Sequence, residues 1–260
     1  MMQVHVDGVK IAYDELGSGA TLVLLHGYPL SRAMWDTHMT TLASHARVVR
    51  IDFRGMGESA FAPGPYLMES LAADVAGVLD AIGVDRAGFV GHSMGGYVAM
   101  AFARMFTERV ERLALLCSRL DADDPERRVQ RSQYADQLEH GDMSSLRIEP
   151  LLGDPIAEDQ QNLRNRIQAL VQANNPQALA QMQRGLALRD ASFDIAEELD
   201  MPVLLIAGRR DQLVPAQQVS AMAAAFPRAS VEWCERSGHL APLEEPERVS
   251  ELLSAFLGLR

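Results

Sequence analysis

Cysteine is scarce in this sequence of 260 residues, which contains only Cys117 and Cys234. Two cysteines cannot build the disulfide framework of a small secreted protein, and both lie in apolar segments, so we expect buried free thiols. Long apolar runs are also missing, because none approaches the roughly 18 residues that a membrane-spanning helix needs. The first residues lack the basic stretch and apolar stretch that mark a secretory leader. We therefore expect a cytoplasmic protein without a membrane span.

Basic residues are outnumbered, because 24 lysines and arginines face 35 aspartates and glutamates, which gives a formal net charge of −11. A surface with this balance repels a phosphate backbone, so we expect no nucleic-acid partner. The seven histidines are scattered and show no HxxxH spacing, and the cysteines no CxxC spacing, that would indicate a metal site. The glycine-rich stretch DFRGMGES lacks the GxxxxGK(S/T) pattern of a phosphate-binding loop. We expect neither a metal nor another cofactor.

Apolar residues make up 48% of the chain and charged residues 23%, which suits one large globular domain. Short β-type segments alternate with helical ones over most of the chain. The expected strands are QVHV, VKIAYDE, TLVLLH, RVVRID, GFVGHS, VERLALLC, PVLLIAG and SVEWC. Helical spacing predicts helices over residues 68–82, 94–106, 215–226 and 246–257. This alternation predicts an α/β fold with a doubly wound, mostly parallel sheet, after a first hairpin turned at Asp7-Gly8.

Residues 119–200 differ in character from the rest of the chain. They contain no β-type run, many glutamines and asparagines, and helical patterns interrupted by prolines. We interpret this segment as a helical cap inserted into a core formed by residues 1–118 and 201–260. Residues 120–200 carry 16 acidic and 8 basic side chains. We interpret this net charge of −8 as a solvated helical surface, with a funnel for cationic substrates as the alternative.

The strongest local signal for chemistry is the pentapeptide from Gly91 to Gly95, which has the pattern G-x-S-x-G with Ser93 at its centre. It stands between an expected strand and an expected helix, where a sharp turn projects the serine hydroxyl out of the sheet. Glycines on both sides avoid the clash that a Cβ would cause there. The free N–H groups at the start of the helix favour negative charge, as a tetrahedral oxyanion requires. Ser93 is therefore the candidate nucleophile.

A second turn follows the expected strand TLVLL, at the residues HGYP. It places the backbone N–H of Tyr28 where it can point toward the same spot as the N–H of Met94. Two such donors would form an oxyanion hole. We expect His26 in this turn to hold the loop by hydrogen bonding, since a better-placed general base lies elsewhere.

Two further strand ends complete a catalytic set. Asp211 follows PVLLIAGRR, and His239 lies in SGHLAPLEEP after the last expected strand. A serine hydroxyl needs an imidazole to take its proton, and the imidazole needs a carboxylate to fix its tautomer. The chain order Ser93, Asp211, His239 is the order expected on a doubly wound sheet of this kind.

Five segments, HGYP, DFRGMGES, GHSMGG, GRRDQLVP and SGHLAPLEEP, resemble in order the motifs of the α/β-hydrolase superfamily. The resemblance spans nearly the whole chain except the inserted segment, and it implies the α/β-hydrolase fold with a helical cap. It implies Ser93 as nucleophile, His239 as base and Asp211 as its acid partner. It also implies backbone oxyanion donors at Tyr28 and Met94. Relatives with aspartate at the elbow act as dehalogenases or epoxide hydrolases, which a serine at this position disfavours.

The function that we expect is that of a serine hydrolase of the carboxylesterase kind, free of cofactors. It would cleave a small to medium carboxylic ester, or a lactone or thioester, through an acyl-Ser93 intermediate. The same residues also permit carbon–carbon bond hydrolysis, perhydrolysis or acyl transfer. A non-enzymatic alternative is a hydrolase-like receptor that holds a small ligand under the cap. The partner is a small molecule in each case, and the sequence indicates no oligomeric state.

Several other polar residues near the motifs are expected to have no catalytic role. His92, beside the nucleophile, is expected to pack under the sheet. Asp121 lies where some relatives carry the triad acid, but Asp211 matches better and Asp121 is interpreted as the start of the cap. Glu244 and Glu245, after His239, are expected to be solvated.

Overall fold

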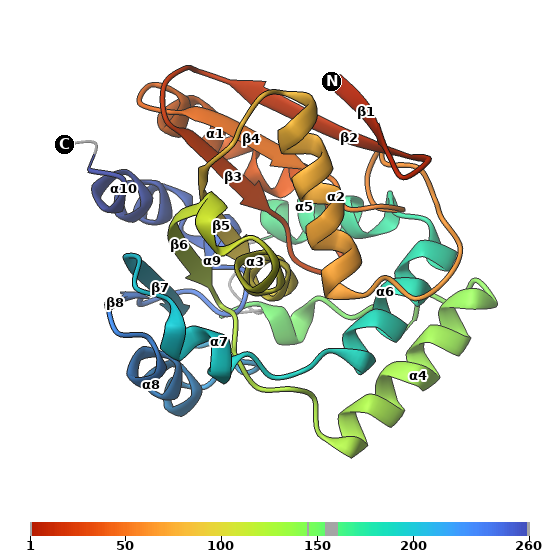
Figure 1. Cartoon of the computed structure of the whole chain (residues 1–260). Coiled ribbons are helices and arrows are strands. Elements are labelled where there is room, and N and C mark those ends of the chain that lie inside the picture. Colours follow the sequence, from red (N-terminus) through yellow and green to blue (C-terminus); the bar gives the residue numbers. More distant parts are fainter. Residues whose placement is uncertain (1, 145, 154–160, 259–260) are drawn as a thin grey trace.

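The computed structural model describes residues 2–144, 146–153 and 161–258 (Figure 1). One eight-stranded sheet runs through it in the order β1-β2-β4-β3-β5-β6-β7-β8. Its strands are β1 (Met2–Val6), β2 (Val9–Leu16), β3 (Thr21–Leu25), β4 (Arg47–Ile51), β5 (Ala87–His92), β6 (Val110–Leu116), β7 (Val203–Gly208) and β8 (Ala229–Cys234). β1 pairs antiparallel with β2, and β2 with β4, whereas all other neighbours are parallel. The predicted α/β fold and its first hairpin are confirmed.

Helices cover both faces of the sheet. On one face lie α2 (Met68–Ala81), α3 (Met94–Met105) and α8 (Ala216–Ala225), and Figure 1 shows α2 and α3 in front of the strands. On the other face lie α1 (Asp36–Ala43), which continues the 3₁₀ turn η1 (Arg32–Trp35), and α10 (Pro246–Phe256). Strands β5 and β7 are buried along their whole length because both of their faces pack against helices. Helices on both faces of the sheet therefore explain why both strands are apolar at nearly every position.

Between β6 and β7 the described residues form helices and loops and no strand. The elements are α4 (Pro125–Glu139), the 3₁₀ turn η3 (Glu149–Leu151), α5 (Gln161–Gln172), α6 (Pro176–Leu188) and α7 (Phe193–Glu198). Asp124 and Asn175 cap α4 and α6 by accepting hydrogen bonds from backbone N–H groups of the first turn. α4 packs along α6, whereas α7 packs against α3 and α8 of the core. The inserted helices agree with a cap, and the boundaries at 119 and 200 stay a prediction.

The part of the chain that the structure describes holds no helix long and apolar enough to cross a membrane. Both cysteines are free and buried, as expected. Burial raises the pKa of the Cys117 thiol, with the negative charge of Asp211 as a further cause. Burial also raises the pKa of the Cys234 thiol to about 12, so neither thiol is a reactive thiolate near neutral pH.

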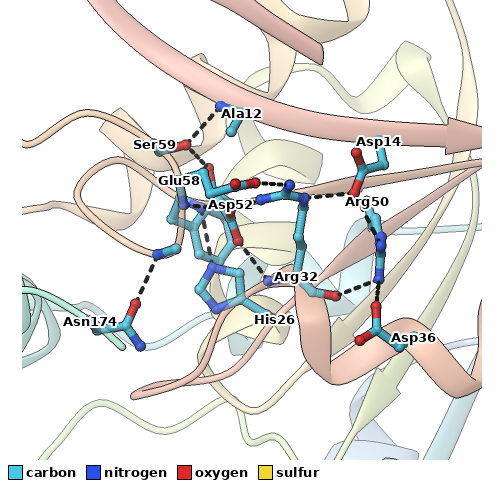
Figure 2. A network of polar contacts seen from close by, with 12 residues as sticks. Ala12, Asp14, His26, Arg32, Asp36, Arg50, Asp52, Glu58, Ser59 and Asn174 are labelled. Carbon is cyan, nitrogen blue, oxygen red and sulfur yellow. Dashed lines mark hydrogen bonds and ion pairs between the residues drawn. The ribbon is translucent and has the colours of Figure 1, made fainter. Parts of the chain in front are cut away.

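A network of charged side chains joins η1, β2 and the loop after β4 (Figure 2). Arg32 donates to the carboxylates of Asp52, Asp14 and Glu58. Asp52 is fully buried and also accepts hydrogen bonds from the backbone N–H groups of Arg32 and Glu58. Asp52 and Glu58 both belong to the DFRGMGES loop after β4, whereas Asp14 lies in β2, so Arg32 ties that loop to the sheet.

Removing the cation at the centre of this network is expected to destabilise the fold. In an Arg32→Leu variant the buried Asp52 carboxylate loses its ion-pair partner, which costs about 3–5 kcal/mol of unfolding free energy. Urea denaturation followed by circular dichroism measures the loss. Arg104→Leu is the matched control, because Arg104 pairs with Asp194 on the surface and little change is expected there. Equal destabilisation of the two variants would contradict this account of Asp52.

Candidate active site

Ser93 occupies the turn between β5 and α3 in a left-handed backbone conformation, with φ of 50° and ψ of −113°. Such a conformation is rare outside glycine and is retained where the surrounding structure enforces it. A Cβ on Gly91 would lie 2.4 Å from the carbonyl oxygen of Gly95, and one on Gly95 would lie 2.3 Å from that of Leu25. Glycine is therefore required on both sides of the serine, as the sequence analysis expected.

The structure brings Ser93, His239 and Asp211 into one hydrogen-bonded chain. The Oγ of Ser93 lies 2.7 Å from Nε2 of His239, and Nδ1 of His239 lies 2.8 Å from Oδ2 of Asp211. The other oxygen of Asp211 accepts hydrogen bonds from the backbone N–H groups of Leu213 and Val214, at 2.8 and 3.1 Å. Asp211 and His239 are buried, while Ser93 is half-buried. This is the geometry of a nucleophile, its base and the residue that orients the base.

His239 lies on a loop that is anchored from two directions. Its backbone N–H donates to the carbonyl of Leu151 in η3, at 2.8 Å. The carboxylate of Glu244 accepts hydrogen bonds from the N–H groups of Gly153 and Gly238, at 2.7 and 2.9 Å. Burial raises the pKa of Glu244. The expectation of a solvated Glu244 is therefore wrong, because this carboxylate joins the inserted segment to the His239 loop.

Glu245 is also not a solvated residue. Its side chain is 10% exposed and accepts hydrogen bonds from the backbone N–H of Arg236 and the hydroxyl of Ser237. The two neighbouring carboxylates thus hold the backbone just before His239. Their acidic character in the sequence suggested surface residues, whereas the folded loop uses them as acceptors.

Tyr28 and Met94 lie beside Ser93 in the wall of one pocket, as the candidate oxyanion donors. Met94 is the first residue of α3, where backbone N–H groups have no carbonyl partner within the helix. His26 holds the loop before Tyr28, since its Nε2 accepts a hydrogen bond from the N–H of Phe53 at 3.1 Å. The structural interpretation of His26 is confirmed.

Asn174, in the segment between α5 and α6, also holds this loop, and no motif in the sequence indicated this role. Its Nδ2 donates to the carbonyl of Pro29 at 2.9 Å, and its Oδ1 accepts from the N–H of Gly57 at 2.8 Å. Figure 2 shows Asn174 reaching toward the loops from the inserted segment. One buried amide therefore connects the inserted helices to two loops of the core.

His92 is fully buried, but it lies at the end of β5 beside the ring of His239 and not under the sheet as expected. Its Nε2 lies 2.7 Å from the carbonyl oxygen of His239 and therefore carries a proton, while its buried Nδ1 has no hydrogen-bond partner among the described residues. Burial, with the nearby His239 ring as second cause, lowers the pKa of His92 to about 3. The unfolded chain binds a proton here near pH 6.5, whereas the folded protein does not until about pH 3.

Stability is therefore expected to fall as pH drops, because protons bind preferentially to the unfolded state. Between pH 6.5 and about pH 4.5 His92 accounts for a loss of about 2 kcal/mol in unfolding free energy. Urea unfolding at both pH values should show a loss smaller by that amount in a His92→Gln variant. His45→Gln, which removes an exposed histidine, should keep the wild-type difference. An unchanged pH dependence in His92→Gln would contradict the assignment.

The pocket above Ser93 has a volume of about 170 Å³ and is lined by residues of both the core and the inserted segment. Its lining includes the four arginines Arg119, Arg127, Arg131 and Arg147, and no described aspartate or glutamate. The described lining of the pocket therefore does not favour the alternative of a funnel for cationic substrates. Among the described residues, no group of three or more histidines, cysteines, aspartates and glutamates could hold a metal ion.

Comparison with known proteins agrees with the observed α/β fold. A family model described as alpha/beta hydrolase fold matches residues 20–246. A thermophilic esterase from Thermogutta terrifontis, solved with malate bound, superimposes with a TM-score of 0.92 at 31% identity, over 99% of this chain and 98% of the esterase. The enol-lactonase from Burkholderia xenovorans LB400 gives a TM-score of 0.91 at 25% identity, over 99% and 100% of the two chains.

Sequence comparison finds similar relatives. The pimeloyl-[acyl-carrier protein] methyl ester esterase of Aeromonas hydrophila is 28% identical over 263 residues, which cover 96% of this chain and 100% of the esterase. The inserted segment and the core are thus matched together. With the family model covering most of the chain, the protein belongs to the α/β-hydrolase family.

Proposed function

We propose that this protein is a serine hydrolase that cleaves a carboxylic ester, or a lactone or thioester, through an acyl-Ser93 intermediate. The observation that carries the proposal is the hydrogen-bonded chain from Ser93 through His239 to Asp211. Its similarity to an esterase and an enol-lactonase over nearly the full length supports the same chemistry. A hydrolase-like receptor would have no need of a base that is aligned with a nucleophile.

The first half of the reaction is acylation. His239 takes the proton of Ser93 as Oγ attacks the ester carbonyl carbon, and Asp211 holds the imidazole in the tautomer that accepts this proton. The negative charge that develops on the carbonyl oxygen is received by the backbone N–H groups of Tyr28 and Met94. When the tetrahedral intermediate collapses, the alcohol leaves with the proton from His239.

The second half is deacylation by water. His239 removes a proton from the water that attacks the acyl-serine, and the oxyanion forms again at the same two N–H groups. Collapse returns the proton to Ser93 and releases the acid. Every step uses groups of the chain itself, so the proposal requires no cofactor. A cytoplasmic location stays a prediction from the sequence.

The experiment that tests the proposal measures hydrolysis of p-nitrophenyl acetate, butyrate and octanoate together with covalent labelling by a fluorophosphonate. Serine-dependent turnover with labelling at Ser93 is the expected result, and the preferred chain length would define the acyl pocket. Labelling without turnover of any ester would contradict ester hydrolysis and point to another electrophile. Absence of labelling would contradict the role of Ser93 as nucleophile and favour a receptor that holds a ligand.

A further inference from the structure

The charge of the pocket differs in sign from the charge of the chain. The whole protein carries −11, and its inserted segment is acidic, yet four arginines and no described carboxylate side chain line the cavity beside Ser93. The acidic residues of the segment that the structure describes therefore do not line the cavity. Guanidinium groups that face a substrate cavity favour a substrate of negative charge.

Helix α4 presents a polar face to this pocket. Arg127, Gln130, Arg131 and Tyr134 all line it, and their spacing of three and four residues places them on one side of the helix. Arg127 and Arg131 stand one turn apart and both are half-buried. The spacing of Arg127 and Arg131 along α4 therefore places both side chains on the face that lines the pocket.

The arginines around this face outnumber the carboxylates that they meet. Arg119, Arg131 and Arg189 all pair with the buried carboxylate of Asp123. The negative charge of Asp121 also acts on Arg119. Arg127 pairs with no described carboxylate, and Arg189 lies outside the pocket lining. Together these four guanidinium groups stand against two carboxylates, an excess of two positive charges.

Two of these arginines have N–H groups without a hydrogen-bond partner among the described residues. The side chain of Arg127 forms no ion pair or hydrogen bond with any residue in the described part of the chain, although it lies in the pocket wall. The Nε of Arg119 is buried and has no hydrogen-bond partner among the described residues. The donors of Arg127 stand at the pocket wall, where an anionic ligand oxygen can accept hydrogen bonds from them. Arg131 is held in place by Asp123 and Gln183.

We infer that the substrate carries a carboxylate in addition to its scissile ester or lactone, and that Arg127 and Arg131 of α4, with Arg119, bind this carboxylate while the ester carbonyl lies at Ser93. The inference rests on the proposed function, whose substrate class it narrows to half-esters of dicarboxylic acids and esters of hydroxy acids. The reaction is ordinary hydrolysis, in which water is consumed and an alcohol and a second carboxylate are released.

The test compares matched anionic and neutral esters by pH-stat titration of the released acid. Monomethyl adipate against methyl hexanoate places the carboxylate on the acyl side, and 4-acetoxybutanoate against butyl acetate places it on the alcohol side. The wild-type kcat/KM should favour the anionic member of one pair by about 10- to 100-fold, as a charged hydrogen bond gives. Raising the salt concentration should reduce this preference.

Variants test whether the pocket arginines cause the preference for the anionic ester. Arg127→Gln should lower kcat/KM for the anionic ester about tenfold and leave kcat/KM for the neutral ester almost unchanged. Arg127→Lys should restore part of the loss. Arg86→Gln is the matched control, because it removes the same charge from an exposed residue outside the pocket and should leave the preference intact. No preference in the wild type, or equal losses on both esters in Arg127→Gln, would overturn the inference.

A second readout does not depend on turnover. Adipate should slow the fluorophosphonate labelling of wild-type Ser93 more than 1,6-hexanediol does, and Arg127→Gln should abolish this difference. Failure of the proposed function would appear as no labelling, or as labelling without turnover of any ester. Failure of the present inference would appear as turnover, or as labelling, that is indifferent to the negative charge.

Discussion

Ser93→Ala is expected to lower the kcat/KM for p-nitrophenyl butyrate by roughly 10⁴- to 10⁶-fold and to abolish fluorophosphonate labelling. The hydroxyl of Ser93 is the group that lies 2.7 Å from Nε2 of His239. Without it no acyl-enzyme forms, and only the oxyanion donors and substrate binding still accelerate the attack of water. Steady-state kinetics and mass spectrometry of the labelled protein measure both effects.

The same variant should remain folded. Ser93 is half-buried, and alanine removes only an oxygen atom whose partner is His239. Thermal unfolding should therefore stay close to that of the wild type. Ser132→Ala removes an exposed hydroxyl on α4 and should retain both turnover and labelling at Ser93. Substantial turnover by Ser93→Ala, with the wild-type preference for chain length, would contradict the acyl-serine mechanism.

The strands and the nucleophile turn follow from local features of the sequence. Strands β3, β5 and β7 are apolar runs because both faces of the sheet are covered, and this requirement is visible in the composition of each run. Gly91 and Gly95 stand where a Cβ would collide with backbone, so the turn around Ser93 is also encoded locally. Ser93, Asp211 and His239 follow β5, β7 and β8, which are parallel strands of one sheet. Their convergence at the carboxyl ends of these strands follows from the sheet topology.

Other features depend on contacts between distant segments, and the sequence did not reveal them. Glu244 accepts a hydrogen bond from Gly153, which is 91 positions away in the chain. Asn174 reaches Pro29 across 145 positions. Nothing in the neighbouring residues distinguishes such side chains from solvated ones. Only the docking of the inserted helices on the core decides their surroundings.

The pocket arginines illustrate the same limit. The spacing of Arg127 and Arg131 places them on one face of α4, which the sequence can indicate. It cannot indicate which face of α4 meets Ser93, because the net charge of −8 over residues 120–200 averages the inner and outer faces. Net charge therefore pointed to an acidic surface, which says nothing about the basic cavity beneath it.

Asp211→Asn is expected to lower kcat by about 10⁴-fold while Ser93 and His239 keep their places. An amide oxygen accepts from Nδ1 as the carboxylate does, but it cannot stabilise the imidazolium that forms when His239 takes the serine proton. If the amide NH₂ faces the ring instead, it favours the wrong tautomer. The readout is the kcat for p-nitrophenyl butyrate, followed over a range of pH.

Asp121→Asn is the matched comparison, because the sequence left Asp121 as the alternative acid. Nδ1 of His239 is bonded to Asp211 at 2.8 Å, while Asp121 acts on Arg119. Loss of the Asp121 charge should therefore leave kcat for a neutral ester within about twofold to threefold of the wild type, since no partner of His239 changes. A loss of similar size in both variants would mean that the two carboxylates share the role of acid. A loss confined to Asp121→Asn would transfer that role to Asp121 and leave Asp211 as a residue that only shapes its loop through Leu213 and Val214.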